Sequence, residues 1–108
     1  MNKTAKAVIA LASLAIPALM APALAAEWTS VERGKELFNS TSLGTNHKSC
    51  ATCHPEGSRL QKAASYSEKR LTKIINLCIR GMLAGKPLPP DSDDMASIIN
   101  YLRTFAPR

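Results

Sequence analysis

Apolar residues recur at helical spacing in three stretches of the chain, and no stretch shows a convincing strand pattern. The first stretch predicts a helix from Ser30, which can cap its first turn, to about Phe38. Gly34 lies in the middle of this stretch, where it would weaken an isolated helix. A glycine there makes sense if another helix crosses closely at that point. The pattern predicts an all-α fold with three main helices.

The second predicted helix begins at Ser67 or Glu68. The residues expected to share its apolar face are Leu71, Ile74, Ile75, Cys78 and Met82, with Leu83 at the border. Gly81 and Gly85 make the end of this helix ragged, and an extended proline-rich loop follows it.

The third predicted helix begins at Asp91 or Ser92. Asp93 and Asp94 then lie at its positive end, where negative charge is favoured. The stripe expected to be buried contains Met95, Ile98, Ile99, Leu102 and Phe105.

The first residues of the chain have the composition of an export signal. Two lysines precede a run of apolar and small residues at about 7–20, and residues 23–25 have the Ala-x-Ala cleavage pattern. We therefore expect a signal peptide at 1–25, cleaved to leave one domain at 26–108 in the periplasm. The rival interpretation, a membrane anchor, is disfavoured by the short run and its prolines, so no membrane span is expected after cleavage.

The mature chain would be small and mildly basic. Removing 25 of the 108 residues leaves 83, so the core is marginal unless a disulfide, metal or cofactor adds to it. Without the two lysines of the signal, twelve basic residues face eight acidic ones, a net charge of +4. The charge is spread out and aromatic residues are few, so nothing favours nucleic acid as a partner.

Cys50, Cys53 and His54 form the pattern Cys-x-x-Cys-His, and Cys78 is the third cysteine. Two thiols at this spacing can bond the two vinyl groups on one edge of a haem. The adjacent histidine then lies beneath the ring and can bind iron from one face. The pattern is the signature of c-type haem attachment, and export of the chain fits it. We expect one covalent haem c at Cys50 and Cys53, with His54 as the proximal iron ligand.

Other uses of Cys-x-x-Cys fit this chain less well. A redox dithiol of thioredoxin type calls for a βαβ pattern nearby, and none is visible. Zinc calls for a second ligand pair of similar spacing, which His47 and Cys78 do not supply. A disulfide between Cys50 and Cys53 is the plain structural alternative.

The chain resembles the class I cytochromes c in its "GKELF" helix, its Cys-x-x-Cys-His motif and its final "NYL" helix. The match covers nearly all of the mature chain. It implies that the first and last helices cross, with Gly34 and Phe38 meeting Tyr101 and Leu102. Many of these proteins also have a proline about a dozen residues past the haem histidine, whose carbonyl orients the ring. That region reads "KAASYS" here, so the acceptor for the Nδ1 proton of His54 is unidentified.

The residue that faces His54 across the haem has several candidates: Cys78, Met82, Met95, His47 or water. Methionine is usual in electron-carrying cytochromes c, but the loop before the last helix contains none. Met95 is expected to pack in the core and His47 to be solvated. Cys78 and Met82 lie one turn apart on the same predicted face, so either could point at the iron.

The stretch 75–102 also resembles the haem domains of thiosulfate dehydrogenases, of SoxA-type sulfur-oxidation cytochromes and of NaxLS-type cytochromes. This resemblance implies that Cys78 is the distal iron ligand. The function expected is then one-electron transfer rather than catalysis. The expected partners are redox proteins, and the chain could form a homodimer or a heterodimer with another cytochrome. The alternatives are a sulfur-compound-oxidising enzyme or subunit, and a protein that binds nitric oxide or carbon monoxide.

Overall fold

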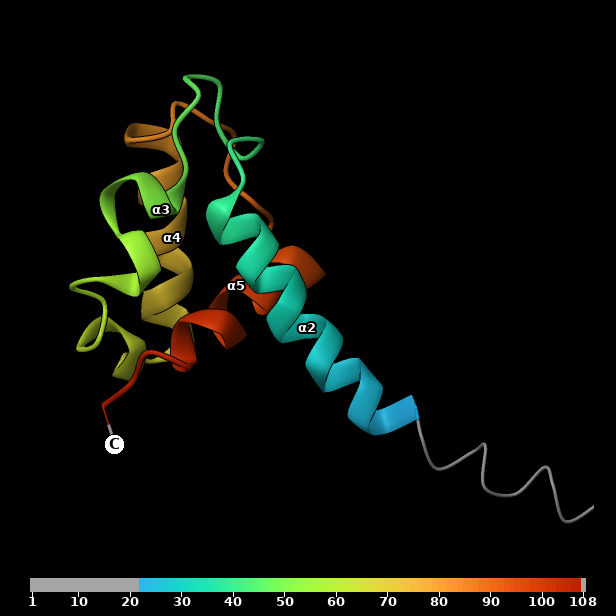
Figure 1. Ribbon diagram of the computed structural model, residues 1–108. Helices are drawn as coiled ribbons and strands as arrows, with labels where there is room; N and C mark the ends of the chain where they lie inside the picture. Colours follow the sequence, from blue (N-terminus) through green and yellow to red (C-terminus); the bar gives the residue numbers. More distant parts are fainter. Residues whose placement is uncertain (1–21, 108) are drawn as a thin grey trace, which may run out of the picture.

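The structure, a computed structural model, describes residues 22–107, which form helices joined by loops and contain no strand. The elements are α2 (Pro22–Asn39), α3 (Cys50–Cys53), the 3₁₀ turns η2 (Pro55–Gly57) and η3 (Ala63–Ser65), α4 (Glu68–Gly81) and α5 (Asp93–Arg103). Figure 1 shows α5 passing across α2, with α3 and α4 together on one side of that crossing. The predicted all-α fold is confirmed for these residues, in which the four-residue α3 accompanies the three longer helices α2, α4 and α5.

The first helix is longer than the sequence pattern predicted. It begins at Pro22 rather than Ser30, so the Ala-x-Ala pattern at 23–25 falls in its first turn. The reason is local, because proline suits the first helical position and alanine has the highest helix propensity. The rest of the predicted signal peptide lies outside the described residues. Within residues 22–107, no helix combines the length and the hydropathy needed to cross a membrane.

Gly34 sets the distance between α2 and α5. A Cβ atom at this position would overlap the Ser97 carbonyl and lie 2.8 Å from Tyr101 Cβ. The two helices can approach this closely only because Gly34 has no side chain. Next to the crossing, the rings of Phe38 and Tyr101 meet edge to face with centroids 5.3 Å apart. The predicted meeting of the first and last helices at Gly34 is confirmed.

Helix α4 begins as predicted, because the Ser67 side chain accepts a hydrogen bond from the Arg70 amide. Its buried face differs from the prediction. The fully buried stripe is Leu71, Ile75 and Ile79, whereas Ile74 is 39% exposed and Met82 65% exposed. The period of the pattern was correct, but the stripe is rotated around the helix, and Ile79 was missed.

Hydrogen bonds attach two loops to α4 and to the turn that follows it. The loop before α3 is tied to the turn after α4, where the Thr45 amide and hydroxyl donate to the carbonyls of Leu83 and Ala84 at 2.9 and 2.7 Å. Farther along, the Asn76 side chain donates through Nδ2 to the Leu88 carbonyl and accepts at Oδ1 from the Leu88 backbone N–H, both at 2.8 Å. The first of these contacts holds the segment that leads into α3 against the C-terminal end of α4.

Candidate haem site

The four-residue helix α3 carries both cysteines of the Cys-x-x-Cys-His motif and ends at His54. Its start is fixed by the Ser49 amide, which donates to the Thr52 hydroxyl at 2.8 Å. Its end is fixed by the His54 amide, which donates to the Cys50 carbonyl at 3.0 Å. One short turn therefore presents the three motif side chains from a single rigid piece of backbone.

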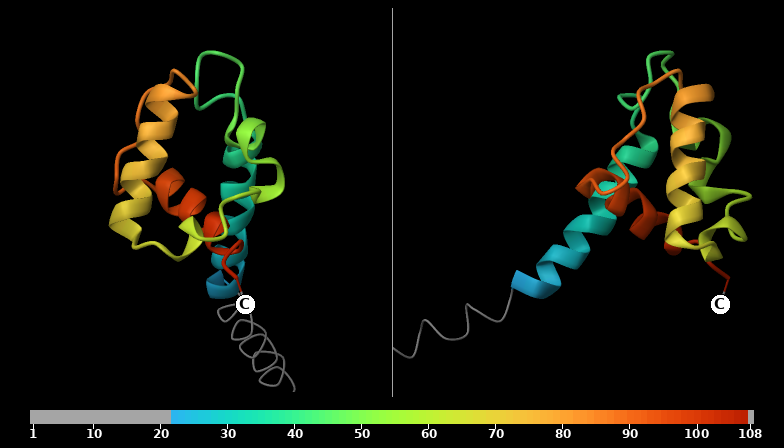
Figure 2. Two further views of the ribbon diagram at one scale, coloured as in Figure 1. Left: turned by 90° about the vertical axis from the view of Figure 1, so that its left-hand side faces the viewer. Right: turned by 180° about the vertical axis from the view of Figure 1, so that it is seen from behind.

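An apolar hollow lies between this turn and α4, and it is lined by Phe38, Cys50, His54, Leu60, Ala63, Leu71, Ile74, Ile75, Cys78, Ile98 and Leu102. A second hollow adjoins it and is lined by Lys48, Ser49, Cys50, Cys53, His54, Cys78, Met82 and Leu83. Because the two share Cys50, His54 and Cys78, we treat them as one site and call it the α3–α4 cleft. In the left view of Figure 2, the green segment with α3 and the yellow-orange α4 stand on opposite sides, with α5 between them lower down.

The imidazole of His54 has a defined tautomer. Its Nδ1 atom lies 2.9 Å from the backbone carbonyl oxygen of Ser58. A carbonyl only accepts hydrogen bonds, so Nδ1 carries the proton, and Nε2 is left with the lone pair that a metal ligand needs. The acceptor that the sequence did not reveal is therefore Ser58. No sequence signal could have identified it, because the acceptor is main chain.

The turn that carries the Ser58 carbonyl depends on Gly57. This glycine has φ +77°, and a Cβ atom on it would lie 2.5–2.6 Å from the ring carbons of Phe105. The aromatic ring of the C-terminal segment therefore packs directly on the backbone that orients His54. The helical spacing predicted Phe105 as part of the core stripe, but it gave no sign of this contact with the site.

Cys50, Cys53 and Cys78 are all free thiols in this structure, and none of them is joined in a disulfide. Burial, together with the neighbouring thiols Cys78 and Cys53, raises the pKa of Cys50 to about 11. Burial, and after it the nearby Cys53, also raises the pKa of Cys78. Cys50 and Cys78 are therefore protonated at neutral pH, as thiols in an apolar setting should be.

The other predicted ligand candidates take different positions. Met82 lines the cleft beside Cys78 and is 65% exposed, so an apolar thioether stands at its open edge. Met95 is fully buried on α5 and is not among the residues that line the cleft. His47 is exposed and does not line the cleft either. The site thus brings His54, Cys78 and Met82 together and leaves Met95 and His47 apart.

The donor set fits a haem better than a bare metal ion. Within residues 22–107, no three His, Cys, Asp or Glu side chains gather as a metal-binding group. A haem brings four nitrogen ligands of its own and needs only axial ligands, an apolar lining and thiols at its edge. All of these are found in the cleft. Searches of family models, curated proteins and solved structures found no match to this chain.

Proposed function

We propose that this chain is a periplasmic c-type cytochrome with a small cytochrome c fold, and that it transfers single electrons through one covalent haem. The observation that carries the proposal is the α3–α4 cleft, in which Cys50, His54 and Cys78 line one apolar hollow. The packing of α2 against α5 at Gly34 supports the fold. The Cys-x-x-Cys-His pattern supports the covalent attachment.

In this proposal the residues of the cleft have separate roles. Cys50 and Cys53 would hold the haem through thioether bonds, each formed by addition of the cysteine S–H across one vinyl group. His54 would bind the iron through Nε2, because its Nδ1–H donates to the Ser58 carbonyl. When bound, the haem supplies an iron that alternates between the ferrous and ferric states. The apolar lining limits the access of water to it.

We propose Cys78 as the distal ligand. It lines the cleft together with His54, and it belongs to neither a disulfide nor the attachment motif. Its pKa is raised by burial, so it must release a proton when it binds iron as a thiolate. The negative charge of the thiolate would stabilise ferric iron and lower the reduction potential relative to a methionine ligand.

The experiment that tests the function is a redox titration of the purified protein, followed by its visible and electron paramagnetic resonance spectra. A reversible one-electron transition between two low-spin states is expected if both axial positions are filled by His54 and a second protein ligand. A high-spin ferric spectrum with an open coordination position would argue against an electron carrier with two protein ligands.

A sulfur-oxidising role is a second candidate because of one cleft residue. Lys48 lines the same hollow as Cys53, Cys78 and Met82. Its ammonium group would attract an anionic sulfur compound towards the Cys78 thiol. Steady-state oxidation of thiosulfate by the isolated protein with ferricyanide as the electron acceptor, with loss of turnover in Lys48→Gln, would favour this candidate. Absence of turnover would favour the electron carrier.

A further inference from the structure

Charged residues are distributed unevenly along the part of the chain that the structure describes. Residues 59–86 contain seven basic residues and one acidic residue, Glu68, for a net charge of +6. The remaining residues of 22–107 contain four basic and seven acidic residues, for a net charge of −3. The positive charge is thus concentrated on α4 and the segment before it, and the negative charge lies elsewhere.

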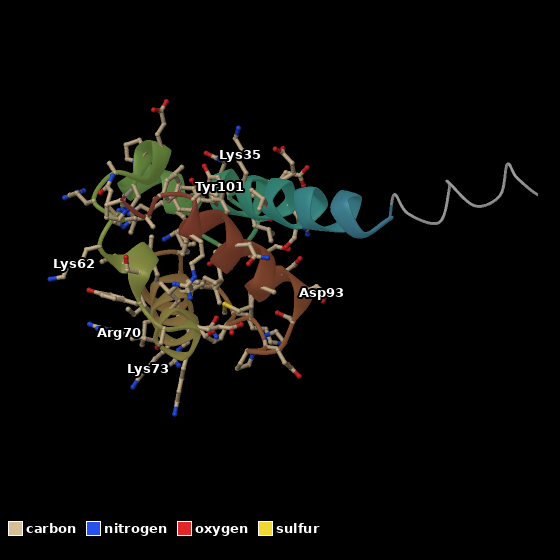
Figure 3. All side chains as sticks on the ribbon, turned by 90° about the horizontal axis from the view of Figure 1, so that it is seen from below. Lys35, Lys62, Arg70, Lys73, Asp93 and Tyr101 are labelled. Carbon is tan, nitrogen blue, oxygen red and sulfur yellow. The ribbon has the colours of Figure 1, made fainter. Side chains whose placement is uncertain are left out.

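Much of the positive charge lies on one face of α4. Lys69 and Lys73 are each two positions from Leu71, and Arg80 is two positions from Cys78. Residues two apart on a helix point in nearly opposite directions, so these cations face away from the α3–α4 cleft. All three are exposed. Figure 3 shows Lys73 at the edge of the molecule, on the side away from α2.

These cations line a hollow that also contains uncharged and apolar side chains. Lys69, Lys73 and Arg80 line it together with Thr72, Asn76, Leu77 and Pro90. Leu77 is 56% exposed, an unusual position for a leucine in the middle of a helix. It lies four residues after Lys73 and three before Arg80, so both cations flank it on the helix surface. Beside them, Arg70 lies over the Tyr66 ring at 3.7 Å, which fixes a further positive charge.

None of the cations of this hollow forms an ion pair in the described part of the chain. The ion pairs found within residues 30–107 are Arg33 with Glu36 and Arg33 with Asp94, and neither includes a residue of the hollow. An exposed leucine surrounded by unpaired cations matches the composition of a binding surface, with an apolar centre and a charged rim. Its concave shape fits a protruding side chain, whereas a flat lipid surface would touch only its edges.

We propose that this hollow on the outer face of α4, lined in part by the exposed Leu77, is the docking surface for an acidic protein partner. The partner would insert an apolar side chain beside Leu77 and place carboxylates against Lys69, Lys73 and Arg80. The surface faces away from the cleft, so the proposal is independent of the cofactor that the cleft holds. The uneven charge would also orient the protein during encounter, with α4 turned towards a negative partner.

The test measures binding of the full-length mature protein to a synthetic peptide of repeated Glu-Glu-Leu units at low ionic strength. Saturable binding is expected, with amide shifts in nuclear magnetic resonance spectra confined to α4 and the Pro90 loop. The double variant Lys69→Gln/Lys73→Gln should weaken binding about tenfold. The matched control Lys35→Gln/Lys62→Gln removes the same net charge at two exposed positions that line neither this hollow nor the α3–α4 cleft, and it should change binding less than about twofold.

A neutral variant separates docking from general attraction between charges. Leu77→Gln leaves every charge in place and should still weaken peptide binding several-fold. Equal effects of the two lysine pairs, or an unchanged affinity in Leu77→Gln, would overturn the proposal, because a general charge effect would then explain the binding. Tighter binding to vesicles of anionic lipid than to the peptide would assign the surface to a membrane. Self-association that is lost in Lys69→Gln/Lys73→Gln would assign it to a second copy of the chain.

Discussion

At the scale of single residues, the site depends on which atoms of His54 and Cys78 remain available. The Ser58 carbonyl accepts a hydrogen bond from the Nδ1–H of His54, so Nε2 keeps the lone pair with which the ring could bind a metal. On the α4 side, Cys78 and Met82 are the two sulfur-bearing candidates that line the cleft. Separate substitutions of Cys78 and Met82 decide which of the two would bind the iron of the proposed haem.

Cys78→Ser is expected to raise the reduction potential, because it removes a negatively charged thiolate that stabilises ferric iron. Met82→Leu is expected to leave the potential and spectrum unchanged, since the two side chains have similar volumes. Potentiometric titration and visible spectra of both variants check this. The opposite result, with a silent Cys78→Ser and a changed Met82→Leu, would make Met82 the ligand. An unchanged potential and spectrum in both variants would make Met95 the next candidate ligand.

Gly57→Ala is expected to destabilise the fold by about 1–3 kcal/mol, because the new Cβ meets the Phe105 ring at a positive φ. The change should also displace the Ser58 carbonyl and thus alter the visible spectrum of the proposed haem, whose iron His54 would bind. Gly81→Ala is the matched control, since a Cβ there has no neighbour within 4 Å. Thermal unfolding measures the first effect, and the visible spectrum measures the second. A destabilised variant with an unaltered spectrum would show that Gly57 does not act through His54.

At the scale of helices, the sequence predicted most of what the backbone does. The starts of α4 and α5 were readable because Ser67 and Ser92 accept hydrogen bonds from amides three residues later. The Gly34 crossing was also readable, since a mid-helix glycine has a cost that only close packing offsets. The rotation of the α4 stripe was not readable, because spacing gives the period of a face but not which neighbouring elements cover it.

The contacts that shape the site were harder to predict for the same kind of reason. The hydrogen bond from His54 to the Ser58 carbonyl and the one from the Thr45 amide to the Leu83 carbonyl both end on backbone oxygens. Backbone groups have no sequence signature. Asn76 was visible only as part of a resemblance around Cys78. Its two hydrogen bonds to Leu88 show a structural role, since they fasten the loop after α4 to the helix that carries Cys78.

Gly34→Ala tests the helix crossing. We expect a loss of about 1–3 kcal/mol in the free energy of unfolding, because α5 must shift to make room for the Cβ. In an uncrowded helix the same change would stabilise by up to about 1 kcal/mol. Denaturant unfolding of this variant beside Gly81→Ala measures the difference. A stabilised Gly34→Ala would contradict the close approach of α2 and α5.

Asn76→Ala should cost about 1–3 kcal/mol, because it leaves the amide and carbonyl of half-buried Leu88 without their partners. Asn100→Ala is the control, since its exposed side chain donates one bond to Ser30 and its loss should cost less than about 1 kcal/mol. Urea unfolding of both proteins measures the costs. Equal, small losses would show that the loop does not depend on Asn76.

At the scale of the whole molecule, the described residues form a small core around an apolar cleft. Phe38, Leu71, Ile75, Ile98 and Leu102 belong to the buried core and also line that cleft. A group bound there would extend the core by contact with side chains on α2, α4 and α5. A cofactor that binds only the folded state would therefore raise the free energy of unfolding of so small a chain.

The central claim is that a haem is bonded covalently to Cys50 and Cys53, and intact-protein mass spectrometry tests it most directly. The protein should be isolated from the periplasm of a host that attaches c-type haem, and then extracted with acidified acetone. The account predicts the mass of the chain from residue 26 plus one haem, unchanged by the extraction, and the mass of the chain alone for Cys50→Ala/Cys53→Ala. A wild-type protein with the mass of the chain alone, or that mass less two hydrogens for a disulfide, would contradict it.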